Sequence, residues 1–157
     1  MAGSSPSTLA RLRPAERHDT QRLKQIANAA YGIYAGSMAT PPQPVRDDYT
    51  ALVNDDAVFV AESQEGVAGF TVLLPIHNAL LLHALAVAPE AQRQGVGAQL
   101  LHFALSHAIS QGLPALEVSL ERAMLPLLGW FGRFGFETIR SPGPGGYQRY
   151  YLRRRLP

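Results

Sequence analysis

A glycine-rich stretch near the middle of the chain has the residue types that hold an anion. It reads Gln92-Arg93-Gln94-Gly95-Val96-Gly97 and lies between an apolar run and a segment with helical periodicity. The first turn of a helix has N–H groups without an intrahelical partner, and the helix dipole adds about half a positive charge there. Because Gly95 and Gly97 lack Cβ atoms, a pyrophosphate can approach the backbone closely, and Arg93 adds a charge. The pattern predicts a phosphate site built from backbone donors.

Other nucleotide-binding motifs also place glycines before a helix, and the spacing helps to separate them. A P-loop needs Gly-Lys followed by Ser or Thr, but Gly97 is followed by Ala98 and Gln99. A dinucleotide fold expects a small residue at position 100, where this chain has leucine, and an acidic residue about twenty positions later. Glu117 and Glu121 can imitate the acidic residue. The dinucleotide interpretation and a glycine turn without any ligand therefore stay open on spacing alone.

The elements that position this loop follow from the apolar periodicity. The nearly unbroken apolar run 80–87 is typical of a central strand covered on both faces, and Pro89 ends it. From Val96 the apolar residues recur at helical spacing up to Gly112, a typical helix terminus. Residues 115–120 then indicate another strand. Strand, loop, helix and strand in this order predict a right-handed crossover between parallel strands.

The rest of the chain adds strands and helices on either side of this unit. A helix with an apolar face formed by Leu23, Ile26, Ala27 and Ala30 is expected early in the chain, and residues 40–44 should form an extended connection. Two hairpins are expected, one on each side of the crossover. The remaining predicted elements are strands at 9–13, 57–61, 67–74, 136–139 and 147–152 and helices at 49–53 and 124–134.

The composition excludes several classes of protein. The chain has 157 residues, 46% hydrophobic and 17% charged, which fits one globular domain at 8–157 after a disordered leader at 1–7. It has no cysteine, which excludes disulfides, thiolate metal sites and thiol nucleophiles. Without a membrane-length apolar run or a signal core, we expect a cytoplasmic protein and no membrane partner. The net charge of +2 and the run Arg153–Arg155 do not indicate a nucleic-acid partner.

The segment from Val87 to Leu101 resembles the acetyl-CoA signature of the GNAT superfamily of N-acetyltransferases, whose core is Gln/Arg-x-x-Gly-x-Gly/Ala. The order of the expected elements and the pair Gly135-Phe136 are also similar to that family. The resemblance implies an α/β, GNAT-like fold in which helices flank a mixed, mostly antiparallel sheet. It also implies that the central parallel strands splay apart after Val87, that acetyl-CoA is the co-substrate, and that no metal is needed.

The same resemblance implies which residues contact acetyl-CoA. Backbone groups of the strand would pair with the pantetheine arm, and the loop would hold the pyrophosphate. An incoming amine would attack the acetyl carbonyl directly while the backbone polarises its oxygen. The implied cofactor-binding residues are Leu85, Ala86, Val87, Gln92, Arg93, Gln94, Gly95, Val96, Gly97, Ala98, Met124 and Phe131.

Two positions depart from the family pattern. Phe131 stands where many members have a tyrosine that protonates the CoA sulfur, and Met124 stands where an asparagine is frequent. A phenyl ring cannot donate a proton. Water, another residue or unassisted departure of the thiolate must then replace the tyrosine, and Tyr147, Tyr150 and Tyr151 are candidates.

His83 is the candidate catalytic base. It occupies the position of a glutamate base in several relatives, and an imidazole with a pKa near 6.5 accepts a proton at neutral pH. A histidine satisfied within the sheet is the alternative interpretation. Glu117 is a weaker candidate, because a carboxylate at the centre of a strand can simply neutralise an arginine. Three other histidines fall at a turn or on a helix surface and carry no predicted role: His77, His102 and His107.

These residues predict an N-acetyltransferase that acts on a primary amine of a small molecule or peptide. The alternative is a CoA-binding module with little or no turnover, acting in regulation or protein interaction. The acceptor has no recognisable signature. Tyr31, Tyr34 and Tyr49 are candidates to line its pocket, and core or interface aromatics are an equal alternative for them. The edge strands and an exposed Trp130 favour a homodimer.

Overall fold

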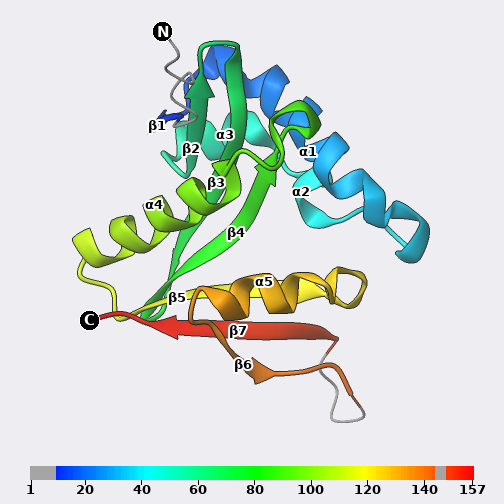
Figure 1. Ribbon diagram of the computed structural model, residues 1–157, viewed down its shortest axis with the longest axis vertical. Helices are drawn as coiled ribbons and strands as arrows, with labels where there is room; N and C mark the ends of the chain where they lie inside the picture. The colour runs from blue at the N-terminus through cyan, green and yellow to red at the C-terminus, as the bar shows by residue number, and fades with distance from the viewer. Residues whose placement is uncertain (1–9, 144–147) are drawn as a thin grey trace, which may run out of the picture.

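Seven strands form one sheet in the part of the chain that the computed structural model describes, residues 10–143 and 148–157. The leader predicted at 1–7 and the candidate Tyr147 lie outside these residues. The sheet order is β1-β2-β3-β4-β5-β7-β6, and every pair is antiparallel except β4 with β5 (Figure 1). The strands are β1 (Arg11–Pro14), β2 (Val58–Ser63), β3 (Gly66–Ile76), β4 (Ala79–Val87), β5 (Ala115–Glu121), β6 (Glu137–Arg140) and β7 (Arg149–Arg155).

Helices cover both faces of this sheet, which confirms the predicted mixed α/β architecture. α1 and α3 pack on one face of β2, β3 and β4, whereas α4 and α5 lie side by side on the other face (Figure 1). Within the described ranges, no helix is both long and apolar enough to cross a membrane. The helices are α1 (Thr20–Tyr31), α2 (Gln43–Arg46), α3 (Tyr49–Asn54), α4 (Val96–Ser110) and α5 (Leu127–Arg133), with short 3₁₀ turns η1 (Arg17–Asp19), η2 (Gly32–Ser37), η3 (Pro89–Ala91) and η4 (Arg122–Met124).

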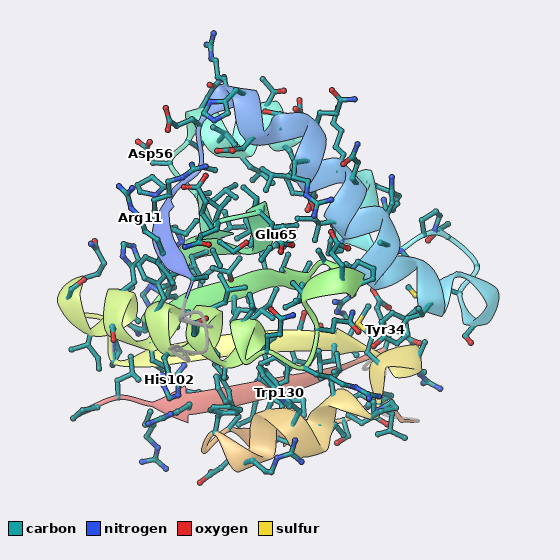
Figure 2. The ribbon with its side chains drawn as sticks, turned by 45° about the horizontal axis from the view of Figure 1, so that its top comes forward. Arg11, Tyr34, Asp56, Glu65, His102 and Trp130 are labelled. Carbon is teal, nitrogen blue, oxygen red and sulfur yellow. The ribbon has the colours of Figure 1, made fainter. Side chains whose placement is uncertain are left out.

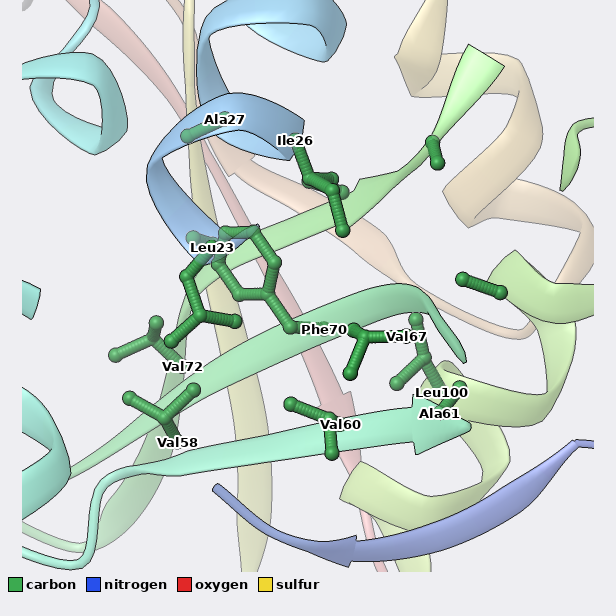
Figure 3. Close-up of a cluster of buried hydrophobic side chains, with 14 of the residues drawn as sticks. Leu23, Ile26, Ala27, Val58, Val60, Ala61, Val67, Phe70, Val72 and Leu100 are labelled. Atoms are coloured by element: carbon green, nitrogen blue, oxygen red, sulfur yellow. The ribbon is translucent and has the colours of Figure 1, made fainter. Parts of the chain in front are cut away.

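The apolar stripe of α1 builds the core on its face of the sheet, as its periodicity predicts. Leu23 and Ile26 are fully buried against side chains of β2 and β3, among them Phe70 (Figure 3). Tyr49 of α3 meets the Phe70 ring edge-on at 5.5 Å and donates its hydroxyl proton to the Pro44 carbonyl oxygen. Of the two interpretations of Tyr49, pocket residue or core aromatic, the structure supports the second, because its side chain belongs to the core.

An extra residue interrupts the pairing of β4 with β3. The Cα register pairs Val72 with Ala84 but Leu73 with Leu82, so His83 is inserted into β4 as a bulge. A bulge bends its strand and increases the local twist. The bend falls at the one residue of this strand that carries a titratable side chain.

The two central strands separate directly at this bulge. β4 pairs with β5 only over Leu80–Leu82, opposite Leu116–Val118, although both strands continue beyond these residues. The splay between parallel strands is thus confirmed, but it begins after Leu82 and not after Val87. The bulge also turns Ala84 and Ala86 toward the core under α1, whereas the leucines before it belong to the core under α4.

Two predicted element boundaries differ from the structure because of proline. The last helix does not begin at Met124, which lies in η4; Pro126 caps α5, which starts at Leu127. Residues 43–44 of the expected extended connection already belong to α2, since the first turn of a helix tolerates Pro44 without a backbone N–H.

We expect Gly69 to be essential for seating α4 against β3. A Cβ atom at this position would lie 2.7 Å from the Ala86 carbonyl oxygen and 3.2 Å from side-chain atoms of Val96 and Leu100. Gly69→Ala should therefore lower the free energy of unfolding by about 1–3 kcal/mol in denaturant titrations. The matched control is Gly129→Ala in α5, where an added Cβ would meet no described atom within 4 Å beyond its chain neighbours and its own helix backbone, and helix propensity should raise stability by up to about 1 kcal/mol. Equal stability of the two variants would contradict this account.

Candidate functional site

A cleft of about 670 Å³ occupies the space where β4 and β5 separate. Its volume falls within the range of about 300–1,000 Å³ that is typical of small-molecule sites. Residues of β4, the β4–α4 loop, β5, η4, α5 and η2 line it. Figure 2 labels two of these residues, Tyr34 beyond α1 and Trp130 on α5.

The cleft brings nearly all of the predicted site residues together. Met124 and Phe131, 4% and 3% exposed, contribute an apolar wall from η4 and α5. Gln94 is the exception, since it is exposed and is not among the residues that line the cleft. Those that do line it are His83, Leu85, Ala86, Val87, Gln92, Arg93, Gly95, Val96, Gly97, Ala98, Met124 and Phe131.

The loop before α4 presents an uncapped helix N-terminus to the cleft. Gly95 is the N-cap residue with a φ of +81°, and no side chain in the described part of the chain caps the helix there. Arg93 also has a positive φ, +66°, a conformation that costs a residue with a Cβ atom about 1–2 kcal/mol. Left-handed residues in a turn make successive N–H groups converge on an anion. The loop thus has the geometry of an anion site, with the Arg93 side chain at the cleft wall.

His83 points from the bulge to a carboxylate that the sequence did not single out. Its Nε2 lies 2.8 Å from Oδ2 of Asp47, and the Gln43 side chain donates to Oδ1 of the same residue at 2.8 Å. The side chains of His83 and Asp47 are 21% and 11% exposed. Since a carboxylate only accepts hydrogen bonds, a neutral His83 carries its proton on Nε2 and leaves Nδ1 with a lone pair.

A tyrosine hydroxyl forms hydrogen bonds with the backbone of β4 beyond the bulge. The Tyr31 hydroxyl donates to the Leu85 carbonyl oxygen at 3.0 Å and accepts from the Leu85 N–H at 3.1 Å. Burial of the phenol disfavours its charged form and raises the pKa of Tyr31 to about 12. Tyr31 and Tyr34 both line the cleft.

Two arginine–carboxylate pairs lie on β5 and β7. Arg149 pairs with Glu121 at the cleft and donates from Nε to the Ser119 hydroxyl at 3.1 Å. Arg153 pairs with Glu117, which does not line the cleft. Glu117 thus neutralises an arginine, which is the alternative to its role as a base.

The remaining candidates lie elsewhere. Trp130 is half-buried and lines the cleft, so the prediction of an exposed tryptophan is wrong. Tyr150 and Tyr151, proposed as replacement proton donors, are partly buried on β7 and do not line the cleft, and neither do His77, His102 and His107. Sequence reasoning missed Asp47, for which the sequence carries no local signal, because its partner lies on another element.

Comparison with protein families identifies the class to which this fold and cleft belong. The model of the acetyltransferase (GNAT) domain matches residues 54–138, more than half of the chain. The chain therefore belongs to the GNAT family of acetyltransferases. The search among curated proteins found no match.

Solved acetyltransferases share the fold over nearly the whole chain. PaiA N-acetyltransferase from Thermoplasma acidophilum, in complex with coenzyme A, is 17% identical with a TM-score of 0.78, covering 93% of this chain and 98% of that one. The ribosomal-protein-S18-alanine N-acetyltransferase from Escherichia coli is 16% identical with a TM-score of 0.71, covering 94% of each chain. N-acetylglutamate synthase from Neisseria gonorrhoeae, complexed with coenzyme A and N-acetyl-glutamate, is 19% identical with a TM-score of 0.71, covering 94% of this chain and 35% of that one. These likenesses show the GNAT fold.

Proposed function

We propose that this chain transfers an acetyl group from acetyl-CoA to a primary amine of a small molecule or peptide. The observation that carries the proposal is one cleft that joins an uncapped helix N-terminus to a carboxylate-bound histidine. Coenzyme A in complexes of other proteins with this fold supports the choice of donor.

The loop and β4 provide the groups that would hold the donor. The first-turn N–H groups of α4 and the Arg93 side chain suit the pyrophosphate, because both favour negative charge. The backbone of Leu85, Ala86 and Val87 lies where β4 has left β5, so these groups can pair with the amides of the pantetheine arm. Acetyl-CoA supplies the activated acyl group, and the Leu85 N–H is the backbone donor proposed for its carbonyl oxygen.

His83 is the proposed general base. The amine nitrogen forms a bond to the acyl carbon, the carbon–sulfur bond breaks, and the amine proton passes to Nδ1 of His83. Asp47 holds the imidazole by Nε2 and stabilises the cation that forms, and Gln43 holds Asp47. The chain itself requires no metal for these steps.

A CoA-binding module with little turnover is the second candidate function. The apolar wall at Phe131 favours it, since this side chain offers no proton to a leaving thiolate. Release of free thiol in the presence of a panel of amines separates the two functions, because a binding module would bind CoA without forming thiol.

We propose further that residues 8–157 form one acetyltransferase domain in a cytoplasmic protein. A homodimer remains our proposal for the assembly. Because Trp130 lines the cleft, that proposal rests on the edge strands β1 and β6.

The loop should be required for CoA binding and not only for folding. Gly95→Ala places a Cβ atom on a left-handed residue at the cleft, so we expect at least a roughly tenfold loss of affinity in calorimetric titrations with CoA. The control is Gly112→Ala at the other end of α4, where φ is +71° and the strain is similar. Both variants should lose about 1 kcal/mol of stability, but only Gly95→Ala should lose affinity for CoA. Wild-type protein that shows no thermal stabilisation by CoA would refute the proposed donor.

His83→Ala should reduce kcat by roughly 10²- to 10⁴-fold while leaving CoA affinity nearly unchanged, because the base acts only in the chemical step. Asp47→Asn should also reduce kcat, by roughly tenfold or more, since an amide can favour the wrong imidazole tautomer. His77→Ala, at the exposed β3–β4 turn, is the matched control and should behave as wild type. Thiol release with an accepted amine measures all three, and unchanged turnover in His83→Ala would remove His83 from this role.

A further inference from the structure

One hydroxyl satisfies both backbone groups of a residue at the centre of the cleft. The N–H and the carbonyl of Leu85 both bond to the Tyr31 hydroxyl, at 3.1 Å and 3.0 Å. Leu85 lies beyond Leu82, where β5 no longer accompanies β4. Tyr31, the last residue of α1, thus supplies from a helix the hydrogen bonds that a neighbouring strand would otherwise supply.

This arrangement places a second donor beside the backbone donor of the proposed reaction. The Leu85 N–H is the group assigned above to the acyl oxygen. Any oxygen that accepts from this N–H lies next to the Tyr31 hydroxyl. A carbonyl oxygen has no proton of its own, so a neutral phenol can only donate to it.

We propose that the Tyr31 hydroxyl donates a hydrogen bond to the acyl oxygen of the bound thioester, together with the Leu85 N–H. This inference rests on the proposed function. The hydroxyl would give up both of its bonds to Leu85, so that the Leu85 N–H is free to donate to the acyl oxygen, and would itself donate to that oxygen, where negative charge develops as the amine attacks.

The protonation state of Tyr31 suits a donor of hydrogen bonds. Burial raises its pKa to about 12, so the phenol stays neutral at any pH at which the enzyme would be assayed. A phenol of this kind keeps its proton. This protonation state suits a donor to the acyl oxygen, and we assign Tyr31 no role as an acid for the sulfur in place of the tyrosine that Phe131 replaces.

The alternative is a tyrosine that only supplies hydrogen bonds to the strand. In that case Tyr31 would move aside without touching the acyl group, and its hydroxyl would matter for stability alone. The two possibilities differ in whether the protein distinguishes a ligand that has the carbonyl oxygen from one that lacks it.

A pair of ligands measures this distinction without turnover. Acetyl-CoA and S-ethyl-CoA, a thioether without the carbonyl oxygen, are each titrated calorimetrically in the absence of an amine. We expect the wild type to prefer acetyl-CoA and Tyr31→Phe to reduce that preference by roughly three- to tenfold, the effect of one hydrogen bond. With an accepted amine, kcat should fall by roughly 10- to 10³-fold and the KM for the amine should change less.

Tyr49→Phe is the matched control. It also removes a buried hydroxyl that donates to a backbone carbonyl, but its ring belongs to the core and does not line the cleft. It should lose stability and keep the wild-type preference for acetyl-CoA. If Tyr31→Phe keeps the preference, or if Tyr49→Phe loses it equally, the role of Tyr31 is overturned while the proposed function stands. If the wild type binds neither ligand, the proposed function fails and this inference fails with it.

Discussion

Backbone N–H and carbonyl groups that leave a sheet must find other partners, and β4 faces this requirement immediately after Leu82. The bulge at His83 bends the strand away from β5 and so creates both the cleft and a stretch of unpaired backbone along its wall. Tyr31 satisfies part of that backbone through its two hydrogen bonds to Leu85. The position of His83, the hydroxyl at Leu85 and the space for a ligand are thus consequences of one irregularity in strand pairing.

The conformation of the glycine-rich loop before α4 depends on packing elsewhere in the protein. The left-handed backbone of Arg93 and the uncapped helix start at Gly95 both cost free energy, so contacts outside the loop must stabilise it. That support comes from Val96 and Leu100, which bury the first turns of α4 against β3 where Gly69 leaves room for them. The strained backbone and the unpaired N–H groups of the loop therefore lie at the cleft, and the packing contacts that stabilise them lie in the core below it.

Local patterns in the sequence predict the order of strands and helices along the chain and the glycine loop, because each depends on periodicity or on glycine at fixed spacing. They cannot locate the bulge. The run 80–87 is apolar on both faces, so its pattern does not show that the alternation of side chains between the two faces shifts at His83. They also miss Asp47. Its neighbour Asp48 caps α3 by accepting from the Ala51 N–H, and only the fold shows which of two adjacent aspartates is left for the histidine. The sequence also predicts an exposed Trp130, because periodicity places it on a face of α5 with no partner along the chain. In the fold, this face of α5 lines the cleft.

Two parts of the cleft wall bear on the missing acid. His83 with Asp47 and the Tyr31 hydroxyl provide polar groups on the β4 side, and the Arg149–Glu121 pair lies on β7 and β5. Met124 and Phe131, in contrast, contribute an apolar stretch from η4 and α5. Charge on the acyl oxygen or on the imidazole can therefore be stabilised by hydrogen bonds, but charge next to Phe131 meets an apolar surface, which disfavours it. In the proposed reaction, donors on β4 would stabilise the acyl oxygen and lower the barrier to attack, whereas departure of the thiolate would be the step with the least help from the protein. An active enzyme and a binding module built on this cleft would then differ most at departure of the thiolate.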